Sequence, residues 1–296
     1  MRVFVTGATG FIGSAIVREL IGAGYQVLGL ARSDTGAAAL GAMGAEVQRG
    51  SLEDLESLRS GAAAADGVIH TAYNHDFSKV VENGELDRCA IEALGGALEG
   101  SDRPLIVTAG VAFLSPGRVA TEDTPAPTGS GMPRVSEQTA LALVSRGLRA
   151  MVMRLPPSVH GDGDHGFVPV LIGIARKERA SAVVGDGLNR WPAVHRLDAA
   201  RLYRLVLEGG VSGVRYHGIA EEGVLFRDIA GVIGRCLDLP VVAKSPEDAS
   251  SHFGWFARFA GMDSPASSVR TAALLGWTPQ QPGLIADIDR PEYFEG

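Results

Sequence analysis

The fold is decided by a short stretch near the N-terminus, Thr6-Gly7-Ala8-Thr9-Gly10-Phe11-Ile12-Gly13. It joins an apolar strand pattern at 2–6 to a helical pattern in which Ile12, Ile16 and Leu20 recur at every fourth position. In such a turn the first glycine permits a tight bend, the second lets the backbone approach a pyrophosphate, and the third lets the helix pack closely on the strand. The amides and positive dipole end of the helix attract the anion. A dinucleotide site is therefore predicted, formed by Gly7, Thr9, Gly10, Phe11, Ile12 and Gly13.

Short apolar segments alternate with helical patterns through the first 155 residues. Strands are expected at about 2–6, 26–31, 45–48, 67–70, 104–109 and 150–154, and a helix at 133–147. Such alternation forms βαβ units, whose right-handed crossovers stack helices on both faces of a parallel sheet. The predicted fold class is α/β, a doubly wound parallel Rossmann-type sheet with a smaller C-terminal substrate lobe. We expect the dinucleotide-binding domain at 1–156 plus about 188–209, and the substrate lobe at about 157–187 and 210–296.

The composition narrows the class of protein. The chain has 296 residues, of which 46% are hydrophobic and 21% are charged, as in an ordinary soluble globular protein. The net charge of -7 argues against a general affinity for nucleic acid or an anionic membrane. No apolar run reaches the roughly 18 residues of a membrane-spanning helix, and no leader pattern precedes the first strand. The only two cysteines, Cys89 and Cys236, are expected to be buried free thiols, so we expect a cytoplasmic protein.

The end of the second predicted strand indicates which dinucleotide binds. NAD-binding domains usually place an Asp or Glu there to hold the ribose 2′-OH. Here the strand ends in Ala31-Arg32-Ser33, and a guanidinium beside a hydroxyl suits a 2′-phosphate through charge-assisted hydrogen bonds. Asp34 could hold a ribose, but it lies late and fits better as an N-cap of the next helix. We therefore predict NADP (NADPH), held by Arg32 and Ser33, with a solvated surface charge as the alternative role of Arg32.

Five further motifs follow the glycine turn in a fixed order. They are Gly50-Ser51-Leu52, His70-Thr71-Ala72, the stretch at 154–161, Gly185-Asp186-Gly187 with the stretch at 194–200, and Leu275-Gly276-Trp277-Thr278-Pro279. With these motifs the chain resembles the short-chain dehydrogenase/reductase superfamily, in its extended or atypical branch, and is most similar to members labelled NAD-dependent epimerase/dehydratase. The resemblance implies adenine near Ser51 and Leu52, ribose and pyrophosphate along Thr71, Ala72 and Tyr73, and nicotinamide against Thr108, Leu155, Pro156 and Ser158.

The proton-transfer residues of that family are missing. Its chemistry uses a tyrosine and a lysine four residues later, whose charge lowers the tyrosine pKa. No lysine here lies four residues after any tyrosine, and if Glu137 aligns with the family's following glutamate, Gly129 and Pro133 occupy the two positions. Gly110 stands where the catalytic serine is expected. The loss weakens the case for catalysis without ending it, because the hydride moves directly between nicotinamide and substrate.

Three residues are candidates for the missing chemistry. His160 replaces the tyrosine of the family's NVYG motif and could donate a proton near neutral pH, or it could be a structural histidine. Asp76, a candidate replacement for the family's usual asparagine, could orient His75 or bind a polar substrate, or it could simply cap a helix. Arg134 could hold a carboxylate or phosphate, or form a surface ion pair. The stretch at 160–165 concentrates histidines and acids, but its spacing matches no strong metal signature, so no metal is predicted.

The function predicted first is that of an NADPH-dependent atypical short-chain oxidoreductase, which reduces a carbonyl or related group of a small molecule with a non-standard proton donor. One alternative is a sugar-nucleotide epimerase or dehydratase, although that chemistry also relies on the missing pair. A second alternative is a non-catalytic NADP-sensing regulatory protein. The expected partner is a small-molecule substrate rather than nucleic acid or membrane. A homodimer is possible, and the sequence does not decide the oligomeric state.

Overall fold

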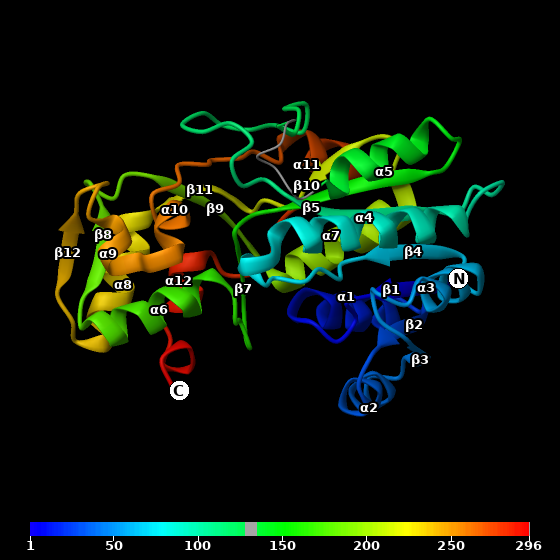
Figure 1. Cartoon of the computed structure of the whole chain (residues 1–296), viewed down its shortest axis with the longest axis horizontal. Helices are drawn as coiled ribbons and strands as arrows, with labels where there is room; N and C mark the ends of the chain where they lie inside the picture. The colour runs from blue at the N-terminus through cyan, green and yellow to red at the C-terminus, as the bar shows by residue number, and fades with distance from the viewer. Residues whose placement is uncertain (128–134, 296) are drawn as a thin grey trace.

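Seven parallel strands form the central sheet of the larger lobe in the computed structural model, which describes residues 1–127 and 135–295 (Figure 1). Their order is β10-β6-β5-β4-β1-β2-β3. Apart from the edge strand β3, the strands are largely buried on both faces, which explains why they read as apolar runs rather than as alternating patterns. The predicted α/β Rossmann-type class is confirmed. The bounds are β1 (Arg2–Thr6), β2 (Gln26–Ala31), β3 (Glu46–Arg49), β4 (Gly67–His70), β5 (Leu105–Gly110), β6 (Ala150–Leu155) and β10 (Arg215–His217).

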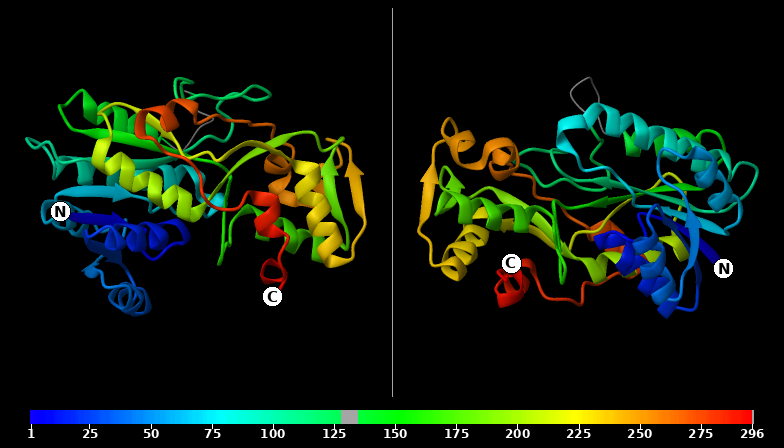
Figure 2. Two further views of the ribbon diagram at one scale, coloured as in Figure 1. Left: turned by 180° about the vertical axis from the view of Figure 1, so that it is seen from behind. Right: turned by 60° about the horizontal axis from the view of Figure 1, so that its bottom comes forward.

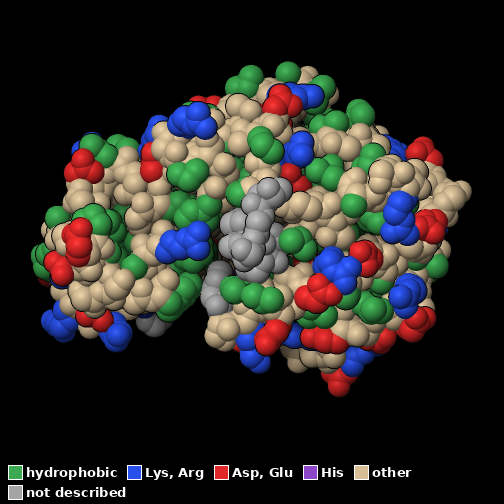
Figure 3. Space-filling model, turned by 45° about the horizontal axis from the view of Figure 1, so that its top comes forward, with side chains coloured by type: hydrophobic (Ala, Val, Ile, Leu, Met, Phe, Trp, Pro, Cys, Tyr) green, Lys and Arg blue, Asp and Glu red, His purple; other side chains and the backbone are tan. Residues whose placement is uncertain are grey.

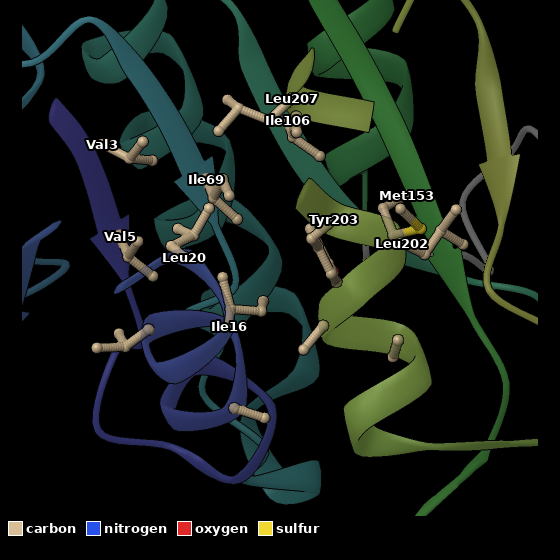
Figure 4. Close-up of a cluster of buried hydrophobic side chains, with 14 of the residues drawn as sticks. Val3, Val5, Ile16, Leu20, Ile69, Ile106, Met153, Leu202, Tyr203 and Leu207 are labelled. Carbon is tan, nitrogen blue, oxygen red and sulfur yellow. The ribbon is translucent and has the colours of Figure 1, made fainter. Parts of the chain in front are cut away.

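Helices cover both faces of this sheet (Figures 1 and 2). One face packs against α1 (Phe11–Gly22), α2 (Asp34–Ala42) and α7 (Arg196–Gly209), and the other against α3 (Leu55–Ala63), α4 (Val80–Gly96) and α5 (Ser136–Val144). Figure 4 shows the first of these two cores, in which α1 and α7 meet over β1, β4, β5 and β6. The alternation of strand and helix thus produces the expected three layers.

The strand at 215–217 departs from the expected division into lobes. We expected residues 210–296 in the smaller lobe, yet β10 pairs in parallel with β6 and extends the central sheet. Helix α11 (Val269–Leu275) also contacts α7, and the buried Trp277 donates a hydrogen bond from its indole nitrogen to the Asp198 carbonyl. The other domain boundaries stay a prediction.

The smaller lobe contains two short sheets and its own apolar core. One sheet has the order β11-β9-β7 and the other is the pair β12-β8. Its core is rich in aromatic side chains, among them Trp191, Phe226 and Phe256, which are fully buried. Its elements are β7 (Ser158–His160), α6 (Phe167–Glu178), β8 (Ser181–Val184), β9 (Arg190–His195), β11 (Glu221–Leu225), α8 (Phe226–Leu237), β12 (Val241–Lys244), α9 (Ala249–Phe253), α10 (Ala257–Ala260) and α12 (Leu284–Ile288), with the 3-10 turns η2 (Gly254–Phe256) and η3 (Pro291–Tyr293).

The two cysteines are free but less buried than expected. Cys89 is half-buried and Cys236 is exposed, so the prediction that both are buried is wrong. Cys236 lies on the outer side of α8 and Cys89 on α4, so neither belongs to an apolar core. Within the described part of the chain, no helix combines the length and apolar character needed to cross a bilayer.

Candidate functional site

The carboxyl ends of β1 and β4 meet where the strand order reverses, which is the position at which doubly wound sheets bind ligands. Thr6 at the end of β1 is in register with His70 at the end of β4, and the Thr6 hydroxyl lies 2.8 Å from His70 Nδ1. The Thr71 hydroxyl donates to the Thr6 carbonyl at 2.8 Å. The glycine turn and the segment after β4, predicted separately from the sequence, therefore lie side by side.

Each glycine of the turn has a distinct steric environment. Gly7 has a φ of +67°, and a Cβ there would lie 2.7 Å from the Ala72 nitrogen. A Cβ on Gly13 would lie 2.0 Å from the Gly7 carbonyl oxygen, so the helix packs on the turn as closely as the pattern predicts. A Cβ on Gly10 would have only the Gly7 carbonyl oxygen within 4 Å, at 3.2 Å. The outer side of Gly10 is therefore open to an approaching group.

The N-terminus of α1 suits an anion. Gly10 at the N-cap provides no side chain to bond the first-turn amides, and no acidic residue lies in that turn. The Arg196 guanidinium lies over the Phe11 ring, with its Cζ 4.9 Å from the ring centroid, and burial together with the nearby Arg18 charge lowers its pKa. Arg196 forms no hydrogen bond or ion pair with the residues described. Local patterns could not reveal this cation, because α7 is more than 180 residues from the turn.

The end of β2 differs in detail from the prediction. The Ser33 hydroxyl accepts the hydrogen bond of the Gly36 amide at 3.1 Å, so Ser33 rather than Asp34 caps α2. Arg49 donates to the Ser33 carbonyl at 2.7 Å and pairs with Asp34. Arg32 is exposed and forms no hydrogen bond or ion pair within the part of the chain that the structure describes. Two guanidinium groups therefore stand at the position where an NAD-binding domain has a carboxylate.

The predicted adenine region lies after β3. Ser51 and Leu52 are both half-buried, and Leu52 packs against the core beneath the sheet. A hydrogen bond from Ser51 and the charge of Arg32 help to lower the pKa of Glu53. Tyr73 is half-buried, and its ring stacks edge-on against His75 with centroids 5.2 Å apart. These residues follow β3 and β4 at the same edge of the sheet as the turn, and their contact with adenine and ribose stays a prediction.

The predicted nicotinamide wall combines hydroxyl groups that are buried or half-buried. Thr108 donates to the His70 carbonyl at 2.7 Å, and its hydroxyl lies 2.6 Å from that of Tyr203, a fully buried residue of α7. Leu155 and Pro156 are buried at the end of β6. The Ser158 hydroxyl is buried and has no hydrogen-bond partner among the described residues. Since a buried polar atom normally has a partner, Ser158 fits a wall that a bound cofactor completes.

His160 lies in a buried polar cluster between β7 and the C-terminal segment. Its Nδ1 is 2.8 Å from an oxygen of Asp287, which also accepts a 3.0 Å hydrogen bond from the Tyr293 hydroxyl. Burial raises the pKa of Asp287, but the bonds from His160 and Tyr293 outweigh it and the pKa falls below its usual value. His160 Nε2 is buried and has no partner among the described residues. The side chain is fully buried, so a proton-donor role, which stays a prediction, requires that substrate reach this atom.

In the structure Asp76 caps a helical turn, which was the alternative to its predicted catalytic or substrate-binding role. Its carboxylate accepts from the Ser78 amide at 3.0 Å and from the Ser78 hydroxyl at 2.6 Å, at the start of the 3-10 turn η1 (Phe77–Lys79). These bonds lower the pKa of Asp76, so at neutral pH it is ionised and is not a proton donor. Helix α4 also carries an asparagine that the sequence analysis overlooked: Asn83 is buried and donates to the Asp76 carbonyl at 2.8 Å. Arg134, Gly129 and Pro133 lie outside the described residues.

Two buried networks escaped the sequence analysis. His70 Nε2 lies 3.0 Å from Asp87 in α4, and the Ser136 hydroxyl at the start of α5 donates to the same carboxylate. Arg154 makes two hydrogen bonds of 2.7 Å to the Glu137 carboxylate.

Among the residues described, no three His, Cys, Asp or Glu side chains are grouped so that they could hold a metal ion. In the stretch at 160–165, Asp162 pairs with Arg290 and Asp164 accepts from the Gly166 amide.

Comparisons with known proteins identify the relatives of this chain. The model of the NAD dependent epimerase/dehydratase family matches residues 3–87. An uncharacterised protein of Schizosaccharomyces pombe is 49% identical over 295 residues, which cover 99% of this chain and 100% of that protein. This chain belongs to the NAD-dependent epimerase/dehydratase family. Another relative is a decarboxylating sterol-4-alpha-carboxylate 3-dehydrogenase of Dictyostelium discoideum, 31% identical over 247 residues, 76% of this chain and 73% of that one.

A solved structure confirms the fold of this family member. The dTDP-glucose 4,6-dehydratase of Streptomyces venezuelae, with NAD bound, superposes with a TM-score of 0.77 over 99% of this chain and 97% of its own. The two sequences are only 21% identical, so the likeness extends to the fold alone.

Proposed function

We propose that the chain is an NADP(H)-dependent oxidoreductase that reduces a carbonyl or related group of a small molecule. The observation that carries the choice of cofactor is the end of β2, where the exposed Arg32 forms no ion pair with the described residues and Arg49 pairs with one oxygen of the Asp34 carboxylate. A planar guanidinium recognises a phosphate through two parallel hydrogen bonds. The Asp34 carboxylate, whose side chain is fully exposed, is the alternative group at this position that could hold a ribose 2′-OH.

The residues of the site would divide the work of binding. The open face of Gly10 and the uncapped amides of α1 would hold the pyrophosphate, with Arg196 above them. Arg32 and Ser33 would hold the 2′-phosphate, and the partnerless hydroxyl of Ser158 would bond the carboxamide end. The cofactor, when bound, supplies the hydride, and the protein orients the two reactants and stabilises developing charge.

The proton donor is a separate proposal. His160 is our candidate, because Asp287 fixes its Nδ1 side and leaves Nε2 without a partner in the described residues. The bonds from His160 and Tyr293 lower the pKa of Asp287, so that carboxylate is ionised and can hold the imidazole in place. In this proposal Asp287 is a positioning residue. The proposal requires substrate binding to uncover Nε2.

The sterol dehydrogenase relative supports redox chemistry, since it is named as an enzyme of that class. The test is NADPH consumption, followed by absorbance at 340 nm over a panel of aldehydes, ketones, quinones and imines. Turnover of any of them supports the proposal. Conversion of a sugar nucleotide with tightly retained cofactor would instead favour an epimerase or dehydratase. Tight NADPH binding without turnover on either panel would favour a regulatory sensor.

Two further expectations accompany this proposal. We propose a cytoplasmic location, which the two free cysteines support, because thiols persist in a reducing compartment. The homodimer stays a prediction, and the oligomeric state is measured by light scattering on the purified protein.

A further inference from the structure

Aromatic side chains gather where the smaller lobe meets the segment that follows β5. The ring centroids of Phe113 and Phe259 are 5.7 Å apart, and Phe259 lies 4.8 Å from Phe167 and 6.2 Å from Trp255. The Arg258 guanidinium stacks over the Phe113 ring, with its Cζ 4.4 Å from the centroid. Figure 3 shows hydrophobic and basic side chains beside the hollow between the two lobes. We call Phe113, Trp255, Arg258 and Phe259 the aromatic wall.

The aromatic wall begins close to the predicted nicotinamide position. Gly110, the last residue of β5, is in register with Leu155, and the Val111 amide donates to the Leu155 carbonyl at 3.0 Å. Phe113 follows Gly110 by three residues, a span of at most about 10 Å. The wall therefore begins within about 10 Å of the strand end that would face the nicotinamide.

The backbone of Phe113 is held in an unfavourable conformation. Its φ of 62° lies in the left-handed region, which is unfavourable for a non-glycine residue. Ser264 of the smaller lobe maintains it, because its buried hydroxyl accepts from the Phe113 amide at 3.2 Å and donates to the Val111 carbonyl at 3.3 Å. Such strain persists where surrounding structure enforces it, and it is concentrated at ligand-binding positions.

Two features of the wall indicate what would bind there. Trp255 exposes 57% of its surface, a large fraction for an indole ring. Arg258 is also exposed, and no carboxylate or other hydrogen-bond acceptor among the described residues engages it. A guanidinium held over a ring by a cation–π contact can still donate its N–H groups to an anion. The wall thus offers ring surface and one fixed positive charge.

We propose that the aromatic wall is the substrate-binding surface, and that it selects flat aromatic carbonyl compounds that carry a carboxylate. This inference rests on the proposed oxidoreductase function. The substrate ring would lie against Phe113 and Trp255, and its carboxylate would pair with Arg258. The reaction forms one C–H bond from the hydride of NADPH and one O–H bond from a proton, so an aldehyde becomes an alcohol and NADPH becomes NADP⁺.

The test compares two substrates of the same shape, 4-carboxybenzaldehyde and 4-methylbenzaldehyde, by kcat/KM with NADPH. We expect the wild type to prefer the carboxylate by about tenfold or more, the worth of one charge-assisted hydrogen bond. Arg258→Met should abolish that preference, and Arg258→Lys should keep part of it. Phe113→Ala should lower kcat/KM for both aldehydes relative to butanal. Arg59→Met, which removes an exposed arginine of α3, is the matched control and should leave the preference unchanged.

The outcomes separate the inference from the proposed function. Turnover without a carboxylate preference, or a preference that survives in Arg258→Met, overturns the inference while the oxidoreductase proposal stands. If no carbonyl compound is reduced, the proposed function fails, and quenching of tryptophan fluorescence by 4-carboxybenzaldehyde then decides the inference alone. Saturable quenching that is weakened in Arg258→Met and lost in Trp255→Phe supports the binding surface. Quenching that neither substitution alters overturns it.

Discussion

Replacement of Gly10 by valine should separate cofactor binding from folding. Gly10 has φ -77° and ψ 174°, a conformation open to any residue, and an added Cβ would have only the Gly7 carbonyl oxygen within 4 Å. The unliganded protein should therefore lose no more than about 1 kcal/mol of unfolding free energy. The two valine methyl groups would occupy the open face that we assign to the pyrophosphate. Gly13→Ala should behave differently, because its Cβ would lie 2.0 Å from the Gly7 carbonyl oxygen and the fold itself should suffer.

The expected loss of affinity follows from the hydrogen bonds removed. A hydrogen bond to a charged group contributes about 1.5–3 kcal/mol, so losing two costs about 3–6 kcal/mol. That corresponds to a Kd for NADPH raised by about 10² to 10⁴. The Kd is measured by titration of NADPH fluorescence, and the unfolding free energy by thermal denaturation without cofactor. Gly41→Val is the control, since nothing lies within 4 Å of a Cβ at that position in α2. A folded Gly10→Val protein whose Kd changes less than threefold would refute the assignment of the pyrophosphate.

Three further predictions concern named side chains. Arg32→Ala should raise the Kd for NADPH by about 10- to 100-fold and leave that for NADH nearly unchanged, and equal effects in parallel titrations would remove Arg32 as the selector. Asp287→Ala leaves a buried histidine without its carboxylate and should lower the unfolding free energy by about 3–5 kcal/mol in urea denaturation, whereas a loss below about 1 kcal/mol would mean that the cluster is not structural. Burial, with the nearby Arg154 charge, lowers the pKa of His217 from 6.5 to about 4. The unfolded chain thus takes up a proton that the folded one does not, so unfolding free energy should fall as pH drops from 6.5 toward 4. His217→Gln should flatten that dependence, and an unchanged slope would contradict the assignment.

Local sequence predicted the strands and the turn well, because hydrophobic periodicity and glycine geometry are properties of neighbouring residues. Strand bounds agree to within about one residue, and the close contact of Gly13 with Gly7 is the one that the pattern requires. Errors appeared where two adjacent residues compete for one role. Ser33 and Asp34 are both good N-cap residues. In the structure Ser33 is the N-cap of α2, because the backbone at the end of β2 places its hydroxyl against the Gly36 amide.

Contacts between distant segments could not be predicted. Arg49 meets Ser33 only because β2 and β3 pair in a register that sets Arg49 opposite Ala31. His160 and Asp287 are 127 positions apart, so the sequence offered no sign that a carboxylate would bond that imidazole. The strand at 215–217 is three residues long, too short for an alternating pattern to reveal that it joins the central sheet.

The backbone conformation of Phe113, in the segment after β5, favours an enzyme over a nucleotide sensor despite the missing tyrosine and lysine. A protein that only senses NADP needs the turn, the α1 amides and a 2′-phosphate site, all of which lie at the β1–β3 side of the sheet. The left-handed backbone of Phe113 costs about 1–3 kcal/mol in a molecule whose whole stability is about 5–15 kcal/mol. That cost is incurred beyond β5, on the side that we propose for the nicotinamide and away from the three features that a sensor needs. A strained backbone at Phe113 is explained if its ring must contact a second molecule that reacts with the cofactor. Arg258, which lies over that ring, would then contact the same molecule.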